Sequence, residues 1–213
     1  MQEEILSVIT NFGCHGRCPY CVVRENGIDV PKTTLEGLDN LGFYLKKYNS
    51  KLISVSGGGD PLHNYREHKD YYSKLSDILN NNNCRLELHT SYINSDFPYS
   101  YCERVVYHLL DIKQLNEITR HGNEIVRAVF VVEDKFTIED INTIAKFCKD
   151  RDSIDELSFR QLIGNDYKTQ YHLHDYLKAG HKKDWYYIEQ SDYNLYYVEG
   201  KIYTKFADIK GDK

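Results

Sequence analysis

The chain lacks the features that would place it in a membrane, on nucleic acid or outside the cell. No apolar run approaches the roughly 18 residues that a membrane-spanning helix requires. The first residues, MQEEIL, are acidic and lack the basic start and apolar centre of a secretory signal. The formal net charge of -5 argues against a protein built to coat nucleic acid. We therefore expect a cytoplasmic protein with no membrane contact and no bulk nucleic acid binding.

The chain also has no repeats, no low-complexity segments and no proline-rich linker, with only 4 prolines in 213 residues. Hydrophobic residues make up 41% and charged residues 28%, which is ordinary for a globular chain. This length predicts one domain with a small appendage. We expect a core over 1–164 and a Tyr-rich C-terminal extension over 165–213 that packs on the core.

Cysteine is scarce as well, and its distribution is uneven. Three of the 6 cysteines lie in the stretch CHGRCPYC at 14–21, and the other three are single residues far apart. A secreted disulfide framework is usually shorter and denser in cysteine. The clustered cysteines therefore indicate a metal or redox site. We expect the isolated ones to be small buried hydrophobic residues: Cys84, Cys102 and Cys148.

Short apolar, β-branched runs alternate with longer amphipathic stretches along the first 164 residues. The runs predict strands at 5–10, 52–56, 85–89, 104–109, 125–132 and 156–162. The amphipathic stretches predict helices at 34–48, 65–80, 112–121 and 138–149, the last with a Thr137 cap. Only the connection between the third and fourth strands is too short for a regular helix. This order predicts parallel β/α units, too few for a closed barrel of eight, and hence an α/β fold that forms a partial (β/α)6 barrel.

The C-terminal extension differs in character from the core. It contains NLYYVEGKIYTKF at 194–206, two alternating runs joined by Glu199 and Gly200, which predict a β-hairpin. We therefore expect a short helix and β-hairpin extension. A cover for the core and a surface for substrate or partner are both open as its role.

Two motifs follow the first two predicted strands. FGCHGRC comes directly after 5–10, and GGGDPL comes directly after 52–56. In parallel α/β folds, functional residues gather at the carboxyl ends of the strands. Both motifs should therefore lie on the same rim of the sheet.

The C-x3-C-x2-C spacing offers three soft thiolates from one loop. Structural zinc sites usually need four ligands in two pairs, and no second C-x2-C exists here, although His15 or a distant cysteine could supply a fourth ligand. Disulfide chemistry needs two cysteines. Three thiolates suit a [4Fe–4S] cluster with one iron left open. A structural zinc site and chance clustering are the alternatives.

The stretch at 14–21 resembles the C-x3-C-x-aromatic-C signature of the radical S-adenosylmethionine (radical SAM) enzymes. SGGGDPL after the second predicted strand resembles their Gly-Gly-Glu-Pro motif, with Asp60 in place of the usual Glu. The resemblance extends over about 5–163 and implies a partial (β/α)6 barrel. It implies a single-cluster member of this superfamily, with a [4Fe–4S] cluster and SAM as cofactors.

The resemblance also implies roles for individual residues. Three thiolates would hold the cluster: Cys14, Cys18 and Cys21. Seven residues would contact SAM: Tyr20 near the adenine, Gly57, Gly58 and Gly59 near the methionine amino group, Asp60 beside them, and Thr90 and Ser91 at the end of the third strand. Loop packing, a plain turn and ordinary strand-end polarity are the alternative explanations of these residues.

Substrate contacts are expected from polar side chains near the ends of strands four to six. The candidates are His108, Asp111, Glu133, Asp134, Arg160 and Gln161. If the barrel prediction is correct, these side chains point toward one cavity, although each alone is also typical of a solvated strand end. The histidines of HLH at 172–174 are a candidate metal pair, and a surface position is the stronger expectation.

The activity that the resemblance implies is reductive cleavage of SAM to a 5′-deoxyadenosyl radical. That radical would abstract hydrogen from a small-molecule, nucleotide or short-peptide substrate, with electrons from a reductant such as flavodoxin or ferredoxin. An activase that installs a glycyl radical on a partner is an alternative, since SGGGDPLHN resembles the SGGDPL of anaerobic ribonucleotide reductase activases. A non-catalytic metal-binding module is the alternative of another class.

The sequence departs from several subfamilies. No later cysteine group could hold an auxiliary cluster, and the Gly-Pro-Gly-x-Arg stretch of many activases is missing before the cysteines. The usual glycine-rich motif of the fifth strand is not recognisable in VRAVFVVED. The resemblance therefore predicts a reaction class and leaves the substrate open.

Overall fold

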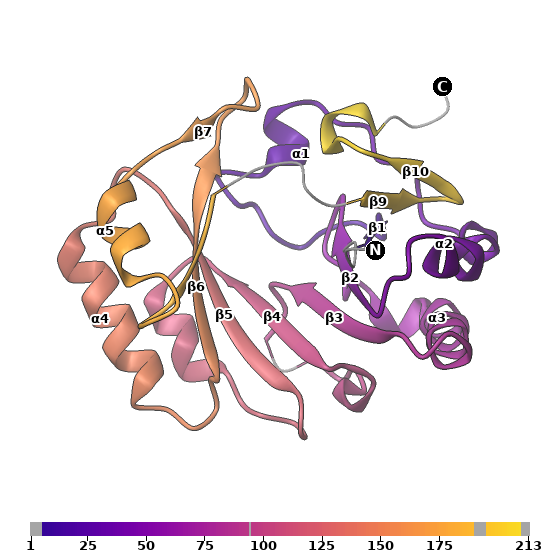
Figure 1. Cartoon of the computed structure of the whole chain (residues 1–213), viewed down its shortest axis with the longest axis horizontal. Helices are drawn as coiled ribbons and strands as arrows, with labels where there is room; N and C mark the ends of the chain where they lie inside the picture. The colour runs from indigo at the N-terminus through magenta and orange to yellow at the C-terminus, as the bar shows by residue number, and fades with distance from the viewer. Residues whose placement is uncertain (1–5, 94, 190–194, 210–213) are drawn as a thin grey trace.

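The computed structural model describes residues 6–93, 95–189 and 195–209. Its centre is an open, curved sheet whose first six strands run parallel in chain order (Figure 1). They are β1 (Leu6–Thr10), β2 (Leu52–Gly57), β3 (Arg85–Thr90), β4 (Arg104–Leu109), β5 (Ile125–Val132) and β6 (Glu156–Ile163). All six predicted strands are confirmed; Ile5, where the first was expected to begin, lies outside the described residues. The sheet does not close, as expected for a partial barrel.

The helices cover the convex face of the sheet, as the period-two burial of the strands requires. In β3, Leu86 and Leu88 are buried in the main hydrophobic core, while the intervening Glu87 and His89 face the concave side. The core is completed by α2 (Leu41–Lys47), α3 (Lys69–Asn81) and α4 (Ile138–Lys149). The concave face carries polar side chains such as Glu87 and His89 beside apolar ones such as Val129.

Three of the four predicted helices are shorter than expected. The 34–48 stretch is divided into a 3-10 turn η1 (Glu36–Leu38) and α2, where Gly37 and Asn40 have low helix propensity. The 65–80 stretch is likewise divided into η2 (Tyr65–Glu67) and α3. The predicted 112–121 helix is only a 3-10 helix, η4 (Ile112–Glu117), because the backbone becomes extended at the β-branched Ile118. These predictions of regular helices were wrong in extent.

Two other expectations about the connections hold. The predicted helix over 138–149 is α4, and the Thr137 and Asp140 side chains form a reciprocal capping box at its start. In its described residues, the connection from β3 to β4 contains one 3-10 turn, η3 (Tyr99–Tyr101), and no α-helix. The convex side of the sheet is thus less covered there.

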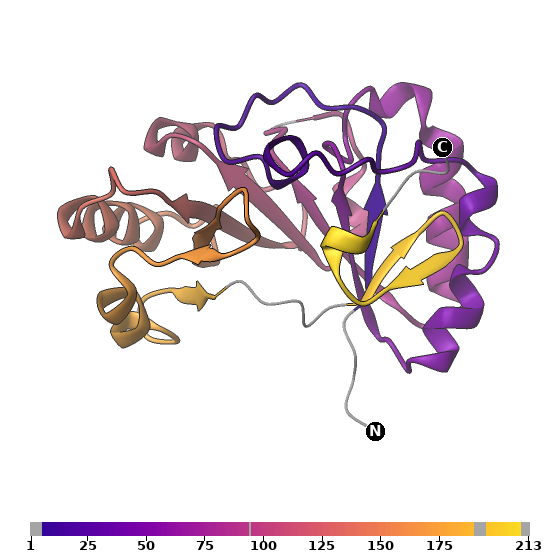
Figure 2. The same cartoon turned by 90° about the horizontal axis from the view of Figure 1, so that it is seen from above.

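The C-terminal extension adds strands to both edges of the sheet (Figures 1 and 2). Its elements are β7 (Thr169–Gln170), α5 (His174–Gly180), β8 (Tyr186–Ile188), β9 (Leu195–Val198), β10 (Lys201–Tyr203) and η5 (Phe206–Asp208). Strand β8 pairs parallel with β6, whereas β9 pairs parallel with β1 and antiparallel with β10. The extension therefore continues the sheet itself.

The β9–β10 hairpin confirms the predicted turn. Glu199 and Gly200 connect the strands with φ of 45° and 77°, the left-handed pair that a tight two-residue hairpin needs. Asn194, where the hairpin was expected to begin, lies outside the described residues. No helix in the described part of the chain is long and apolar enough to cross a membrane.

Candidate functional site

The two motif loops meet at the carboxyl ends of β1 and β2. Thr10 and Gly57 are the last paired residues of these strands. Beyond them, the Gly58 N–H donates to the Thr10 carbonyl at 2.7 Å, and the Asp60 N–H donates to the Gly13 carbonyl at 2.9 Å. The backbone just before the cysteines is thus hydrogen-bonded to the GGGDP loop. Both motifs lie on one rim, as the strand order indicates, and Figure 2 shows the loop with α1 (Val22–Glu25) running across one end of the sheet.

The glycines of GGGDP are required by contacts within the chain. A Cβ atom added at Gly58 would lie 2.5 Å from the Val30 Cβ, and one at Gly59 would lie 2.0 Å from the Gly13 carbonyl oxygen. A Cβ atom at Gly57 would lie 2.0 Å from the Gly59 oxygen. We expected these glycines to make room for a ligand. In the structure, the room that each one leaves is occupied by the chain itself.

Asp60 holds the GGGDP loop to the end of β3. Its side chain is buried, and Oδ1 accepts hydrogen bonds from the Leu62 N–H at 2.9 Å and from the Thr90 hydroxyl at 2.7 Å. The second oxygen, Oδ2, accepts from both the N–H and the hydroxyl of Ser91, each at 2.7 Å. All four bonds are made to a carboxylate with little access to water, so they anchor this loop strongly.

The three cysteines differ in exposure and none forms a disulfide. Cys14 is exposed, while Cys18 and Cys21 are half-buried. The Cys14 sulfur accepts a hydrogen bond from the Gly16 N–H at 3.3 Å. A Cβ atom at Gly16 would lie 3.6 Å from the Cys14 sulfur and 3.5 Å from the Cys18 sulfur, so both sulfurs border the same small space. Cys21 is the N-cap residue of α1, and its side chain makes no capping bond there.

The electrostatics of the loop favour the neutral thiols. Burial raises the pKa of Cys14 and of Cys18, and the neighbouring Cys21 thiol raises both further. A cationic group would reverse this effect and favour thiolates. Within the described residues, no three His, Cys, Asp or Glu side chains are gathered closely enough to hold one metal ion. The donor set, three thiols from one loop, fits an iron–sulfur cluster chemically.

His15 and Tyr20 lie in the cysteine loop and contact different strands. The His15 Nε2 is 3.5 Å from the Ser91 hydroxyl, and its ring lies 3.6 Å from the Tyr92 ring. The Tyr20 hydroxyl donates to the Leu109 carbonyl at 3.5 Å, and burial raises the pKa of Tyr20. Tyr20 also lines an open pocket of about 280 Å³ with Glu133 and residues of the β6–β7 hairpin.

The six substrate candidates do not face one cavity, which corrects the expectation. Asp111 is exposed and caps η4 by accepting the Lys113 N–H at 2.8 Å. Gln161 points to the opposite face from Arg160, because successive side chains of β6 alternate. The Gln161 amide is bonded to the backbone of His172 and to the Tyr187 hydroxyl.

The remaining candidates lie at two places. Glu133 pairs with Lys135 at 2.9 Å beside the Tyr20 pocket, while the neighbouring Asp134 is exposed. His108 and Arg160 lie on the concave face of β4 and β6. Burial lowers the pKa of His108 well below its usual value, and the charge of Arg160 lowers it further.

The histidines at 172 and 174 have separate structural partners. His172 Nε2 bonds to the Phe136 carbonyl at 2.7 Å, and His174 Nδ1 bonds to the Tyr187 hydroxyl at 2.7 Å. Both side chains are half-buried. These bonds explain the two residues without a metal.

A charged network on the concave face was missed by the sequence analysis. Arg104 pairs with Glu87 at 2.5 Å and with Glu156 at 3.1 Å, and Glu156 also pairs with Arg127 at 2.6 Å. Their side chains are only 13–19% exposed. The signal in the sequence was the charged or His residue at every second position of RLELHT, which the apolar positions between them obscured.

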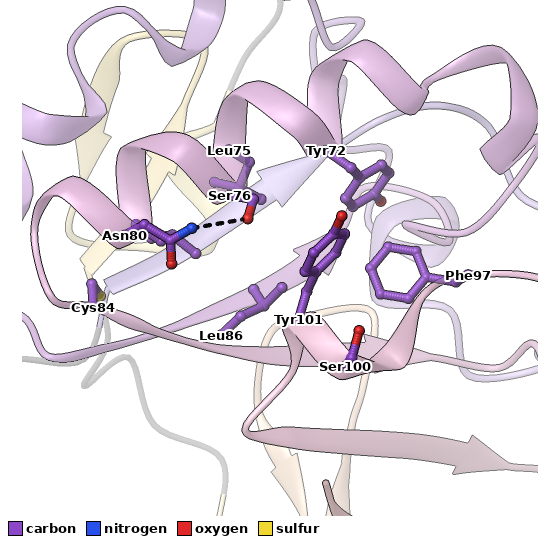
Figure 3. A pocket seen from close by; sticks show the side chains of 10 residues that line it. Tyr72, Leu75, Ser76, Asn80, Cys84, Leu86, Phe97, Ser100 and Tyr101 are labelled. Atoms are coloured by element: carbon purple, nitrogen blue, oxygen red, sulfur yellow. Dashed lines mark hydrogen bonds between the residues drawn. The ribbon is translucent and has the colours of Figure 1, made fainter. Parts of the chain in front are cut away.

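A smaller cavity lies on the convex side of the sheet (Figure 3). It occupies about 140 Å³ between α3 and η3, beneath the connection that lacks an α-helix. Tyr72 and Leu75 of α3 line one wall, Leu86 of β3 lines the floor, and Tyr101 borders it opposite (Figure 3). This cavity belongs to the helix layer and not to the cysteine rim.

Comparison with known proteins identifies a fold relationship. No protein-family model matches the chain, and no curated protein matches it in sequence. Among solved structures, the chain is similar to SuiB of Streptococcus suis, determined bound to the precursor peptide SuiA, with a TM-score of 0.59 and 14% identity. The match covers 88% of this chain and 48% of the SuiB chain, so this chain spans about half the length of SuiB. At this identity the likeness shows the fold alone, an α/β fold with an open, mostly parallel sheet.

Proposed function

We propose that the chain is a radical SAM enzyme whose cysteine loop holds a [4Fe–4S] cluster. The observation that carries the proposal is the bond from the Asp60 N–H to the Gly13 carbonyl, which joins the GGGDP loop to the residue before Cys14. Two motifs that resemble those of one enzyme class thus lie together at the edge where parallel α/β folds carry their chemistry. The open, mostly parallel sheet, as expected for a partial barrel, supports the same conclusion.

In this proposal the chain holds the cofactors in place. Cys14, Cys18 and Cys21 would bind three irons of the cluster as thiolates. When bound, the cluster supplies the electron for reductive cleavage of SAM, which yields the hydrogen-abstracting 5′-deoxyadenosyl radical. The backbone of the GGGDP loop would present polar groups to SAM.

Asp60, Thr90 and Ser91 act in this proposal as positioning residues. The Thr90 hydroxyl donates to Asp60 and accepts from the Tyr92 N–H at 3.0 Å, and Thr90 is buried. Its polar atoms are therefore committed to the chain. Ser91 is half-buried, and its hydroxyl also reaches His15. These residues would fix the loops that meet SAM, and Ser91 is the better candidate for a direct contact.

The Tyr20 pocket is our proposed place for the adenine end of SAM. Tyr20 lines it with an aromatic side chain, and residues of the β6–β7 hairpin, among them the polar Asn165 and Gln170, line it as well. Glu133 supplies a carboxylate at the same pocket. An aromatic wall with a few polar groups is suited to a flat heterocycle.

A short peptide is the first substrate class to test. SuiB was determined bound to a precursor peptide, and its fold resembles that of this chain. Small molecules and nucleotides are the other classes that the proposal allows, with flavodoxin or ferredoxin as the electron donor.

Anaerobic reconstitution with iron and sulfide tests the proposal. We expect about four irons per chain and release of 5′-deoxyadenosine and methionine in equal amounts when SAM and a strong reductant are added. A Cys18→Ala protein treated identically is the matched control and should release neither product. A full iron content without 5′-deoxyadenosine would instead indicate a metal-binding module.

A further inference from the structure

Three side chains on the concave face of the sheet form a linear hydrogen-bonded chain. Glu87 and His89 project from β3 to the same side, and His108 projects there from β4. The Glu87 Oε1 is 2.7 Å from the His89 Nε2, and the His89 Nδ1 is 3.0 Å from the His108 Nε2. Both ring nitrogens of His89 are therefore in hydrogen bonds, one with Glu87 and one with His108.

The carboxylate fixes the direction of this chain. The second Glu87 oxygen accepts a hydrogen bond from Arg104 at 2.5 Å. Although burial alone would raise it, the bonds from His89 and Arg104 lower the pKa of Glu87 to about 2. Glu87 is thus ionised at neutral pH and can only accept hydrogen bonds. The His89 Nε2 must carry the proton that it shares with Glu87.

The tautomer of His108 follows from that of His89. Neutral His89, protonated at Nε2, offers a lone pair at Nδ1, so the His108 Nε2 must be the donor of the 3.0 Å bond. Neutral His108 then carries a lone pair on Nδ1. Among the described residues, no protein group hydrogen-bonds to this Nδ1, and the residue is half-buried. The neighbour across the ladder is the apolar Val129 of β5.

We propose that Glu87, His89 and His108 form a proton relay whose acceptor is the His108 Nδ1. A proton taken up from a donor group at Nδ1 is accompanied by transfer of the His108 Nε2 proton to the His89 Nδ1. The bond from the donor atom to its proton breaks, and a new N–H bond forms on each ring. His108 ends neutral, as the other tautomer, and the positive charge resides on His89 beside the Glu87 carboxylate.

The charges around the relay explain why two histidines are used. Arg160 of β6 disfavours a positive charge on His108, and burial does the same. The positive charge is stabilised one ring further away, where Glu87 accepts from His89. Arg104, Arg127 and Glu156 are further charged groups on this face, and Arg127 also lies under the Tyr186 ring of β8 at 4.8 Å. His108 alone would have no neighbouring group to which it could pass the positive charge.

The relay defines the chemical class of its ligand. The His108 Nδ1 fits an N–H or O–H group, and the positive charge of Arg160 favours a donor that becomes anionic on losing its proton. This part of the inference rests on the proposed function, because it takes the concave face as the place where substrate binds. The relay itself does not depend on the cluster or on SAM.

Nitrogen NMR of the full chain labelled with ¹⁵N-histidine tests the relay. We expect His108 to be protonated at Nε2 and bare at Nδ1 at neutral pH, with His89 protonated at Nε2. On acidification, His89 should become doubly protonated in the same step in which the His108 proton changes from Nε2 to Nδ1. Acidification that makes His108 itself doubly protonated while His89 stays neutral would overturn the proposal.

A matched pair of variants separates the relay from simple packing. In Glu87→Gln, Arg104 holds the amide oxygen, so the amide N–H₂ faces His89 and must donate to it. His89 is then protonated at Nδ1 and His108 at Nδ1, which reverses both tautomers. The control, Glu156→Gln, removes a carboxylate from the same network that does not contact His89, and it should leave both tautomers as in the parent.

Two outcomes of these variant experiments would overturn the proposal. Unchanged tautomers in a folded Glu87→Gln protein, or the same reversal in Glu156→Gln, would exclude the relay. Because these spectra need no cluster, SAM or substrate, a failed relay would leave the proposed function standing. A chain that releases no 5′-deoxyadenosine could still show the expected tautomers.

Discussion

Ser91 donates two hydrogen bonds to one oxygen of Asp60, one from its backbone N–H and one from its hydroxyl, both at 2.7 Å. The bonds connect the end of β3 to the loop after β2. That loop is itself bonded to the residue before Cys14. Asp60 therefore links three consecutive strands of the sheet at their carboxyl ends, and the geometry of the proposed cofactor site depends on it.

Replacing Asp60 should be costly even without a cofactor. Each Asp60 oxygen accepts from one backbone N–H and one hydroxyl. In Asp60→Asn an amide N–H₂ replaces one of these oxygens, so a buried backbone N–H is left facing another donor and the remaining bonds lose their charged acceptor. Losing bonds to a buried charged group costs about 1.5–3 kcal/mol each. We expect the free energy of unfolding to fall by about 3 kcal/mol or more in urea denaturation.

Asp96→Asn is the matched control for this measurement. Asp96 pairs with Arg66 at 2.7 Å, but both side chains are at least half-exposed. Exposed pairs contribute about 0–1 kcal/mol. An Asp60→Asn protein that unfolds at the same urea concentration as the parent would contradict the anchoring role.

The glycines of GGGDP give a second prediction about stability. Gly58→Ala should destabilise the fold by about 1–3 kcal/mol, because its Cβ would overlap the Val30 side chain. Gly58→Ala should cost less in a Val30→Gly background than in the parent, and a double-mutant cycle measures this difference as coupling between the two positions. In Gly59→Ala the new Cβ atom would overlap the Gly13 backbone oxygen, so its cost should be the same in the Val30→Gly background as in the parent.

A helical glycine controls for the general effect of adding a methyl group. Gly42 lies in α2, where a Cβ atom would be 3.4 Å from the Asn82 side chain. Gly42→Ala should therefore be neutral or stabilise by about 0.5–1 kcal/mol. Equal melting temperatures for the Gly58→Ala protein and the parent would show that the close contact with Val30 does not exist.

Much of the fold could be predicted because the strands are buried on the helix side and short apolar runs mark them. The 3-10 segments could not, since their windows contain the same apolar spacing as α-helices. Ile118, for example, fits the helical pattern of 112–121, yet its own backbone is extended and its side chain is buried. Tertiary burial outweighed local periodicity there.

The candidate site was predictable to a lesser degree. The rim position of the two motifs follows from strand order alone. The roles of Asp111 and Gln161 could not be predicted in this way. Asp111 caps η4 and Gln161 contacts the C-terminal extension, and both roles depend on the side to which each side chain points. The relay was hidden for the same reason: Glu87 and His89 acquire meaning only once β4 places His108 beside them.

The cysteines should divide into two groups in their effect on iron. Changing Cys14, Cys18 or Cys21 to Ala should abolish the brown cluster after anaerobic reconstitution, because each removes one thiolate of the proposed site. The matched changes are made at buried positions: Cys84→Ala, Cys102→Ala and Cys148→Ala. These should keep full iron and cost about 1 kcal/mol of stability.

Burial explains why the second group should not bind iron. It raises the pKa of Cys102 and of Cys148 to about 12, so both remain thiols at neutral pH. Iron content and visible absorbance are the measurements. A full cluster in the Cys18→Ala protein would show that the ligands have been assigned wrongly.

The lowered pKa of Glu87 predicts how stability depends on pH. An unfolded Glu has a pKa of about 4.3. In the folded chain burial would raise the pKa of Glu87, but the bonds from His89 and Arg104 lower it to about 2. Its contribution is therefore fully present above about pH 5 and is lost as the pH falls toward 2. The size of the shift corresponds to a contribution on the order of 3 kcal/mol.

Glu87→Gln should accordingly be less stable than the parent at pH 7, and the difference should shrink as the pH falls. Urea denaturation at several values between pH 7 and pH 3 measures both curves. Glu103→Gln is the control, because Glu103 pairs with Arg85 at 2.6 Å in a more exposed position, with side chains 37% and 57% exposed, and its loss should cost less than about 1 kcal/mol. A gap between Glu87→Gln and the parent that stays constant over this range would mean that Glu87 stabilises the fold through its shape and not its charge. The relay would then lose the fixed carboxylate on which its direction depends.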